Sequence, residues 1–203
     1  MDYPSGVLRK SQSLAVITIF TALIVGSDYA MAPLADVKLL DSLVFLAAYL
    51  FGFRIGASVA VLSEFIWAYG TPWGSPGIIA PFLIAGEVIY ALAGTFASRI
   101  WAGKLDFRSG TNIAIGGILA VCAFVWDLEV DAVTAVIAYW PALTLPKLLW
   151  TMFGPFTLVF TLAHEVSDFV FGAFLIPALI VIIPKFGLGN RFGQEPILAE
   201  KKS

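Results

Sequence analysis

The sequence predicts an all-α polytopic membrane protein, with six transmembrane helices in a single membrane domain over residues 1–203. Two observations support this fold class. The chain is 60% hydrophobic with a mean hydropathy of +0.91, whereas soluble domains average about 45–50% apolar residues. Apolar runs of helical length also recur along it, separated by short polar or Gly/Pro-rich stretches. Because a spanning helix needs roughly 20 apolar residues, the length accommodates about six spans with short loops.

The expected spans follow the apolar runs in order. The first run is long enough to be a retained span rather than a cleaved signal. The second and third are short for a bilayer, so we expect them to tilt or to pack against protein at their ends. The six spans are predicted at residues 13–34, 37–53, 56–69, 78–101, 112–127 and 155–183.

The connections between spans are predicted from turn-forming residues. Spans two and three meet in the turn Phe51–Gly56, where Gly52 and Gly56 allow a sharp reversal without a Cβ penalty. Gly and Pro mark residues 71–77 as a loop, and residues 102–111 are polar. Residues 128–154 combine an amphipathic stretch with two prolines, which predicts an interfacial, lid-like connection.

Lys and Arg residues predict the orientation of the protein in the membrane. Lys38 and Lys147 fall on one side of a six-span topology. The other ten fall on the opposite side: Arg9, Lys10, Arg54, Arg99, Lys104, Arg108, Lys185, Arg191, Lys201 and Lys202. Because Lys and Arg are enriched in cytoplasmic loops, we expect both termini to be cytoplasmic, in the multi-pass topology of a prokaryotic cell-membrane protein.

Acidic residues within the spans are the main functional signal. A charged side chain at a span centre costs roughly 2.5–3.5 kcal/mol on insertion scales. Glu64, Glu87 and Asp127 each share a helix face with small residues. Small residues indicate faces that pack against other helices rather than lipid. We therefore expect these acids to point into the bundle.

Span six has the densest polar cluster. Thr161, His164, Glu165 and Asp168 fall within an arc of about 100°. His164 and Asp168 lie one turn apart and can interact directly, so a local hydrogen bond that orders the helix is the structural alternative to a binding role. With neighbouring aromatic residues, the candidate substrate-binding set is Asp28, Glu64, Trp67, Trp73, Glu87, Tyr90, Trp126, Asp127, Thr161, His164, Glu165 and Asp168.

Several function classes lack their sequence signals. One histidine and one cysteine argue against a dedicated zinc or haem site, and the second histidine of a zinc-protease motif is missing after His164. Neither a phosphate-binding P-loop nor a G-x-S-x-G elbow is found. We therefore expect no enzyme activity, no cofactor and no metal, and any ATP-driven step requires another subunit.

Small residues in the first span predict a surface for a partner helix. Ala22, Gly26 and Ala30 repeat every four residues, a spacing that allows close helix approach in membranes. Asp28 lies about 200° around the helix from Gly26. The small residues are thus expected to face a partner while the acid faces the bundle interior.

The order of these features resembles the substrate-binding S components of energy-coupling factor (ECF) vitamin transporters. The small-residue stripe of the first helix is followed by Phe51–Gly56 (FGFRIG), similar to an LGPRAG-like turn. Ala123–Leu128 (AFVWDL) is similar to the family pattern TLxYDLLTN. Phe153–Thr157 (FGPFT) with His164–Asp168 (HEVSD) is similar to GxPFTxxHxxSN.

The resemblance implies a six-helix subunit with a site near the outer face, covered by loops at about residues 31–37 and 71–77. It implies a vitamin-like substrate, a transmembrane T subunit that packs on the small-residue stripe, and two cytoplasmic ATPase subunits. Asp168 stands where many members have Asn, and Glu129 and Asp131 replace an expected Thr and Asn, which allows a substrate other than the common vitamins. Nickel and cobalt members have a histidine near the N-terminus, whereas this chain has none there.

The leading hypothesis is therefore a high-affinity binding subunit for a small organic molecule. The excess of inward acids suggests a cationic or amine-bearing ring, such as thiamine or a pyrimidine precursor. One alternative is a proton- or cation-coupled secondary transporter that uses the same acids as a relay. Another is an accessory subunit of a membrane complex, with no small-molecule ligand.

Overall fold

The computed structural model describes residues 8–34, 36–101 and 110–186, which form helices and short connections without strands. Four helical segments are long and apolar enough to cross a membrane: Lys10–Met31, Gly77–Trp101, Thr111–Tyr139 and Pro155–Ile182. The prediction of an all-helical chain is thus confirmed, and the apolar helices support a membrane protein. Six spans and the orientation of the termini stay predictions. The polar loop predicted at 102–111 lies largely outside the described residues, as do the cations at 104, 108, 191, 201 and 202.

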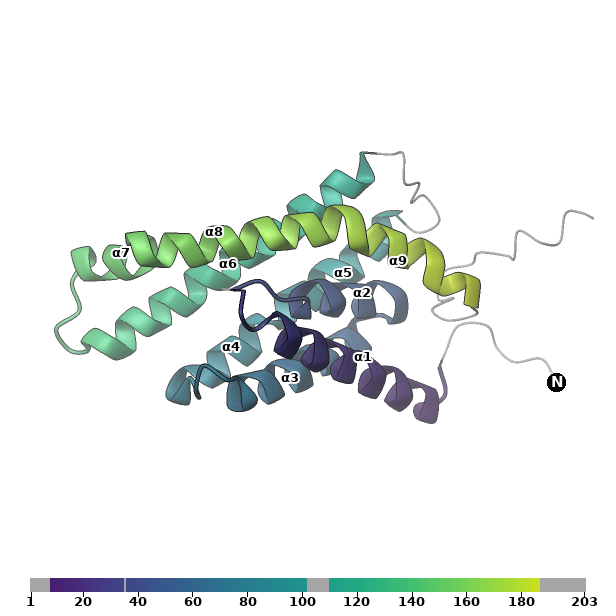
Figure 1. Cartoon of the computed structure of the whole chain (residues 1–203), viewed down its shortest axis with the longest axis horizontal. Helices are drawn as coiled ribbons and strands as arrows, with labels where there is room; N and C mark the ends of the chain where they lie inside the picture. The colour runs from purple at the N-terminus through teal and green to yellow at the C-terminus, as the bar shows by residue number, and fades with distance from the viewer. Residues whose placement is uncertain (1–7, 35, 102–109, 187–203) are drawn as a thin grey trace, which may run out of the picture.

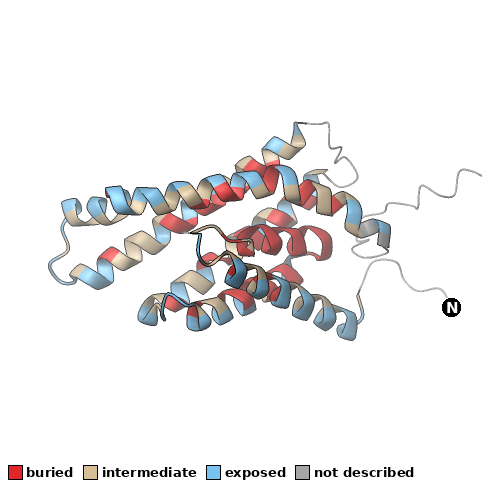
Figure 2. Ribbon diagram, in the orientation of Figure 1, coloured by how far each residue is buried: buried red, intermediate tan, exposed pale blue. Residues whose placement is uncertain are grey.

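A short central helix organises the bundle. Every residue of α2 (Leu40–Phe51) is buried, and the helix lies inside the molecule (Figures 1 and 2). It packs against α1 (Lys10–Met31), α3 (Phe53–Gly70), α5 (Val88–Trp101) and α9 (Ile176–Ile182). At 1.5 Å per residue its 12 residues reach about 18 Å, well short of a hydrocarbon core of about 30 Å. The run is apolar because protein surrounds it on all sides.

The turn between α2 and α3 is tighter than predicted. Gly52 has a φ of 87° and its N–H donates to the carbonyl of Ala48 at 2.8 Å, and α3 begins at the next residue. Gly56 lies inside α3, where an added Cβ would collide with Ala48. The two glycines therefore differ: Gly52 makes the reversal, and Gly56 lets α3 approach α2.

The fourth predicted span is a broken helix. It consists of η1 (Gly77–Ile79), α4 (Ala80–Gly86) and α5, with Glu87 at the break. The N–H of Glu87 still donates to the carbonyl of Leu83 at 3.1 Å. The break therefore places an acidic side chain inside a candidate membrane span.

The fifth helix is longer than predicted. α6 (Thr111–Tyr139) continues through Asp127 without interruption. The connection to the last span is therefore shorter than predicted and consists of residues 140–144 and the helix α7 (Leu145–Phe153). Residues 128–139 contain acids but neither Gly nor Pro. Acids lower hydropathy without breaking a helix, so the polar boundary near Asp127 was wrongly predicted as a helix end.

The last predicted span is observed as one irregular helix. α8 (Pro155–Val170) continues through a π-helical turn, η2 (Phe171–Leu175), into α9 and η3 (Ile183–Phe186). Pro177, near the start of α9, has no N–H and its ring conflicts with the carbonyl four residues earlier, which accounts for the wider turn before it. α8 packs along α6 (Figure 1), and the two form the wall next to α2.

Candidate substrate site

Polar and ionisable side chains from seven segments meet beside the N-terminal end of α2. We call them the buried cluster: Asp28, Lys38, Asp41, Glu64, Glu87, Tyr90, Asp127, His164 and Asp168. Each residue is at most 8% exposed. They come from α1, the α1–α2 connection, α2, α3, the α4–α5 break with α5, α6 and α8. Ionisable groups at this depth indicate function by default in a membrane protein.

His164 links two helices through both of its ring nitrogens. Nδ1 lies 3.1 Å from Oδ1 of Asp127, and Nε2 lies 3.2 Å from Oδ2 of Asp41. A neutral imidazole has one N–H, so it can donate to one carboxylate. For both nitrogens to make favourable contacts, a second proton must be shared between His164 and one carboxyl group, or a cation must lie between one nitrogen and the oxygen that it faces. His164 is therefore the point where α2, α6 and α8 are joined.

Lys38 is the buried cation of the cluster. Its Nζ lies 3.9 Å from Oδ1 of Asp41 and 4.3 Å from the ring centre of Trp126, within the range of cation–π attraction. Burial lowers the pKa of Lys38, but Asp41 and Glu64 raise it more, so the net pKa lies well above its usual value. Lys38 is thus held as an ammonium.

The connection that holds Lys38 is tied to the first helix by a hydrogen bond. The N–H of Leu39 donates to Oδ1 of Asp28 at 3.0 Å, which ties the connection to α1. Asp36 has a φ of 55°, and burial raises the pKa of its carboxyl group while Lys38 opposes that shift. A carboxyl oxygen of Asp36 lies within 4.8 Å of ligand atoms of Asp127 and His164, so this part of the connection lies against the cluster.

Negative groups outnumber positive ones in the buried cluster. Six carboxyl groups face one ammonium and one imidazole. Within the part of the chain that the structure describes, the carboxyl oxygens of Glu87 and Asp168 and the Tyr90 hydroxyl make no hydrogen bond of normal length. Glu87 still interacts with Asp41, and Asp168 with Tyr90. Because an unsatisfied buried polar group is costly, protons or a bound cation must balance this cluster.

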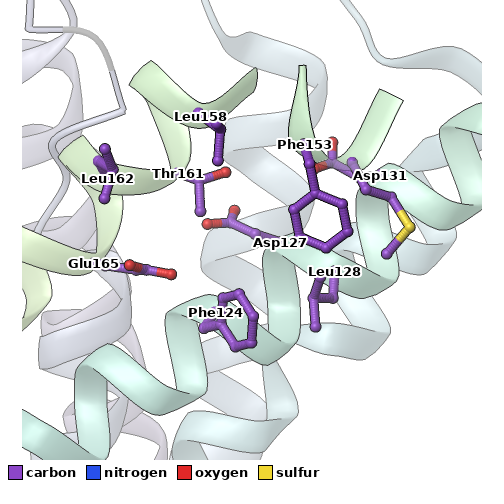
Figure 3. A pocket seen from close by; sticks show the side chains of 10 residues that line it. Phe124, Asp127, Leu128, Asp131, Phe153, Leu158, Thr161, Leu162 and Glu165 are labelled. Atoms are coloured by element: carbon purple, nitrogen blue, oxygen red, sulfur yellow. The ribbon is translucent and has the colours of Figure 1, made fainter. Parts of the chain in front are cut away.

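A pocket of about 200 Å³ opens next to the cluster, between α6, α7 and α8. Asp127, Asp131, Thr161 and Glu165 supply its polar side chains, which lie among apolar ones (Figure 3). The remaining lining is apolar: Phe124, Leu128, Met152, Phe153, Leu158 and Leu162. Asp127 belongs to both sites, since one of its oxygens contacts His164. An apolar pocket with a few converging polar groups is the usual form of a small-molecule site.

The predicted residues divide between these sites. Asp28, Glu64, Glu87, Tyr90, Asp127, His164 and Asp168 lie in the buried cluster, with Trp126 against it, and Thr161 and Glu165 line the pocket. Trp67 instead makes an edge contact with Tyr29 of α1. Trp73 is 72% exposed and contributes to neither site. Ala22, Gly26 and Ala30 lie on the exposed face of α1, opposite Asp28.

Sequence reasoning missed four residues of these sites. Asp41 and Lys38 are central to the cluster, Asp36 lies at its edge, and Asp131 lines the pocket. An available signal was the position of Asp41 in the first turn of a helix, where the dipole stabilises an acid. Its pairing with His164, 123 residues away, leaves no local pattern.

Two groups of side chains in the described residues could hold a metal ion. One is Asp36, Asp127 and His164, and the other is Asp41, His164 and Asp168. Within each group the ligand atoms lie within 4.8 Å of one another. The sequence argument against a metal counted histidine and cysteine, and it could not see which aspartates surround the one histidine.

Comparison with known proteins gives no relative: no family model, curated protein or solved structure matches this chain.

Proposed function

We propose that this protein is the substrate-binding membrane subunit of an ATP-driven importer of the ECF type. It captures a small, positively charged, vitamin-like molecule and delivers it with a T subunit and two ATPase subunits. The observation that carries the proposal is the acidic pocket between α6 and α8, which adjoins a cluster of unbalanced carboxyl groups among apolar helices. Rings of Phe124 and Phe153 beside Asp127, Asp131 and Glu165 suit a flat cationic ligand.

The sequence features of the resemblance add to this support. Four helices that are long and apolar enough to cross a membrane fit a membrane subunit, and the exposed small-residue stripe of α1 offers a surface for a membrane partner. Since the sequence has no P-loop, the ATPase activity is assigned to separate subunits.

An uptake experiment tests the proposal. Cells that lack the gene are complemented with the wild-type chain or with the double variant Asp131→Asn/Glu165→Gln, and uptake of labelled thiamine and other cationic heterocycles is followed. We expect uptake with the wild type, strong reduction in the variant, and loss on ATP depletion even while the ion gradient is maintained. A wild-type chain that supports no uptake of any tested cation, or an unaffected variant, contradicts the proposal.

The second candidate is a proton-coupled transporter. His164 between Asp127 and Asp41 is the observation that favours it, because these groups share protons that they can pass on. Proteoliposomes that contain this chain alone distinguish the two. Uptake that needs no ATPase and stops on adding a protonophore supports the proton-coupled candidate and removes the first.

A further inference from the structure

We propose that Asp41, His164 and Asp168 form a binding site for a divalent first-row transition-metal ion, such as Zn²⁺ or Mn²⁺, beneath the pocket. The site lies in the buried cluster rather than in the organic-cation pocket of the proposed function, and it is argued from the positions of its ligand atoms. A carboxylate–imidazole set with two acids suits these ions, because imidazole favours zinc while carboxylates favour manganese.

The first observation is the spacing of the ligand atoms. One atom from each residue lies within 4.8 Å of the others, and Nε2 of His164 lies 3.2 Å from Oδ2 of Asp41. Two ligands at about 2.0–2.2 Å from one metal, at tetrahedral or octahedral angles, are roughly 3.0–3.5 Å apart. The observed separation therefore equals one edge of a coordination polyhedron.

The second observation is the partner of the other ring nitrogen. Nδ1 of His164 lies 3.1 Å from Asp127. A metal-bound histidine almost always donates its second N–H to a carboxylate or carbonyl, which fixes the tautomer and leaves the first nitrogen free to ligate. With the proton on Nδ1, Nε2 would direct its lone pair at Asp41, and a metal between them removes that conflict.

The third observation concerns the surroundings of Asp168. Asp168 is 0% exposed, and neither of its carboxyl oxygens makes a hydrogen bond of normal length in the described part of the chain, although the Tyr90 hydroxyl is near enough to interact with it. One of these oxygens lies within 4.8 Å of the ligand atoms of His164 and Asp41. A fully buried carboxyl group without such hydrogen bonds requires a proton or a cation.

Lys38 leaves room for this ion. Its ammonium contacts Oδ1 of Asp41 at 3.9 Å, whereas Oδ2 is the oxygen that faces His164. Glu64 and Glu87 add two more carboxyl groups to the same buried cluster. Lys38 and an ion would therefore use different oxygens of Asp41, and both can be accommodated.

A second arrangement would place the ion at the other ring nitrogen, Nδ1. Asp36, Asp127 and Nδ1 of His164 are close enough for an ion. Asp36 is half-buried and belongs to the α1–α2 connection, and Nε2 would then need its proton for Asp41. Because Asp168 would have no role in that arrangement, we assign the ion to Nε2 of His164.

The experiment uses the full-length protein without a histidine tag, purified in detergent and stripped with EDTA. ZnCl₂ and MnCl₂ are titrated, bound metal is measured by mass spectrometry of the elements after desalting, and the melting temperature is recorded. The variants are Asp168→Asn, Asp36→Asn and, as a pocket control, Asp131→Asn.

We expect about one ion per wild-type chain and a rise in melting temperature on metal addition. Because loss of an outer-shell partner alone costs about 10–100-fold in affinity, Asp168→Asn should weaken binding by at least as much, while Asp36→Asn and Asp131→Asn keep it. If Asp36→Asn loses metal binding while Asp168→Asn keeps it, the ion lies at Nδ1 of His164, and the assignment is overturned. A wild-type chain that takes up no metal and shows no thermal shift overturns it even if the variants do not fold. None of these outcomes depends on pocket ligand binding, so the proposed function is tested separately.

Discussion

His164 shows at the scale of a residue what helix periodicity can and cannot predict. Its position on the inward face of the last span was predicted, and the side chain is buried. A hydrogen bond to Asp168, one turn away, was the structural alternative to a binding role, but the partners are Asp41 and Asp127. Periodicity assigns a residue to a face, whereas the helix opposite that face depends on tertiary packing.

Replacing His164 by alanine should strongly destabilise the fold. The variant leaves Asp41 and Asp127 buried without their shared partner, and removing one member of a buried charged pair costs roughly 3–5 kcal/mol. Denaturant unfolding in detergent measures the change. Glu165→Gln, one residue along on the half-buried pocket side, is the matched control and should stay close to wild type. Equal stability of the two variants would show that the His164 contacts contribute little.

Lys38→Met should lower stability in a way that depends on pH. The pKa of Lys38 is raised by neighbouring carboxylates despite its burial, so the folded state favours the ammonium. The contribution is therefore fully present below the unfolded pKa of about 10.4 and is lost as the pH rises through the higher folded value. Melting temperatures between pH 7 and 11 should show a constant deficit of the variant that narrows only at the alkaline end. A deficit that disappears near neutral pH would contradict a charged Lys38.

At the scale of the helices, glycines allow neighbouring helices to pack closely. An added Cβ at Gly94 of α5 would collide with the backbone carbonyl of Phe45 in α2, and one at Gly116 of α6 would meet Phe169 and Ala173. The inward faces with Glu87 and Asp127 were predicted from these small residues. Their exact partners were not, because a small residue indicates close packing without identifying the neighbour.

Gly94→Ala should destabilise the bundle although alanine is the better helix former. Overpacking typically costs 1–3 kcal/mol, which exceeds the helix-propensity gain of about 1 kcal/mol. Gly117→Ala on α6 is the control, since no atom lies within 4 Å of its added Cβ, and it should be neutral or stabilising. Unfolding in detergent compares the two. A stabilised Gly94→Ala would mean that α2 and α5 are not in close contact.

Helix ends show where the sequence prediction failed. Hydropathy marked the polar residues after Asp127 as the end of a span, but α6 continues to Tyr139 because helix breakers are absent there. The first span was placed three residues too far along the chain, at 13–34 instead of Lys10–Met31. The spacing of apolar residues predicted that the elements are helices and in which order they occur. Where each helix ends depends on helix-breaking residues such as Gly and Pro.

The whole molecule has an outer surface that suits a membrane partner. Ala22, Gly26 and Ala30 are exposed on α1 together with the large apolar residues Leu14, Ile19 and Leu23. Gly26→Leu should therefore leave the isolated chain folded, since nothing lies within 4 Å of an added Cβ. If the proposed importer forms, we expect the variant to be isolated from native membranes without the proposed T subunit and ATPases, while its melting temperature stays unchanged. Recovery of the same ATPase complex from the variant would show that the stripe is not the docking surface.

The most direct test of the central claim is mass spectrometry of small molecules released from the purified, detergent-solubilised full-length protein, with Asp131→Asn/Glu165→Gln as the matched control. We predict one cationic, vitamin-like compound in near-stoichiometric amount from the wild type and its loss from the control. A wild-type protein that releases no such compound and binds none on addition would contradict a substrate-binding subunit.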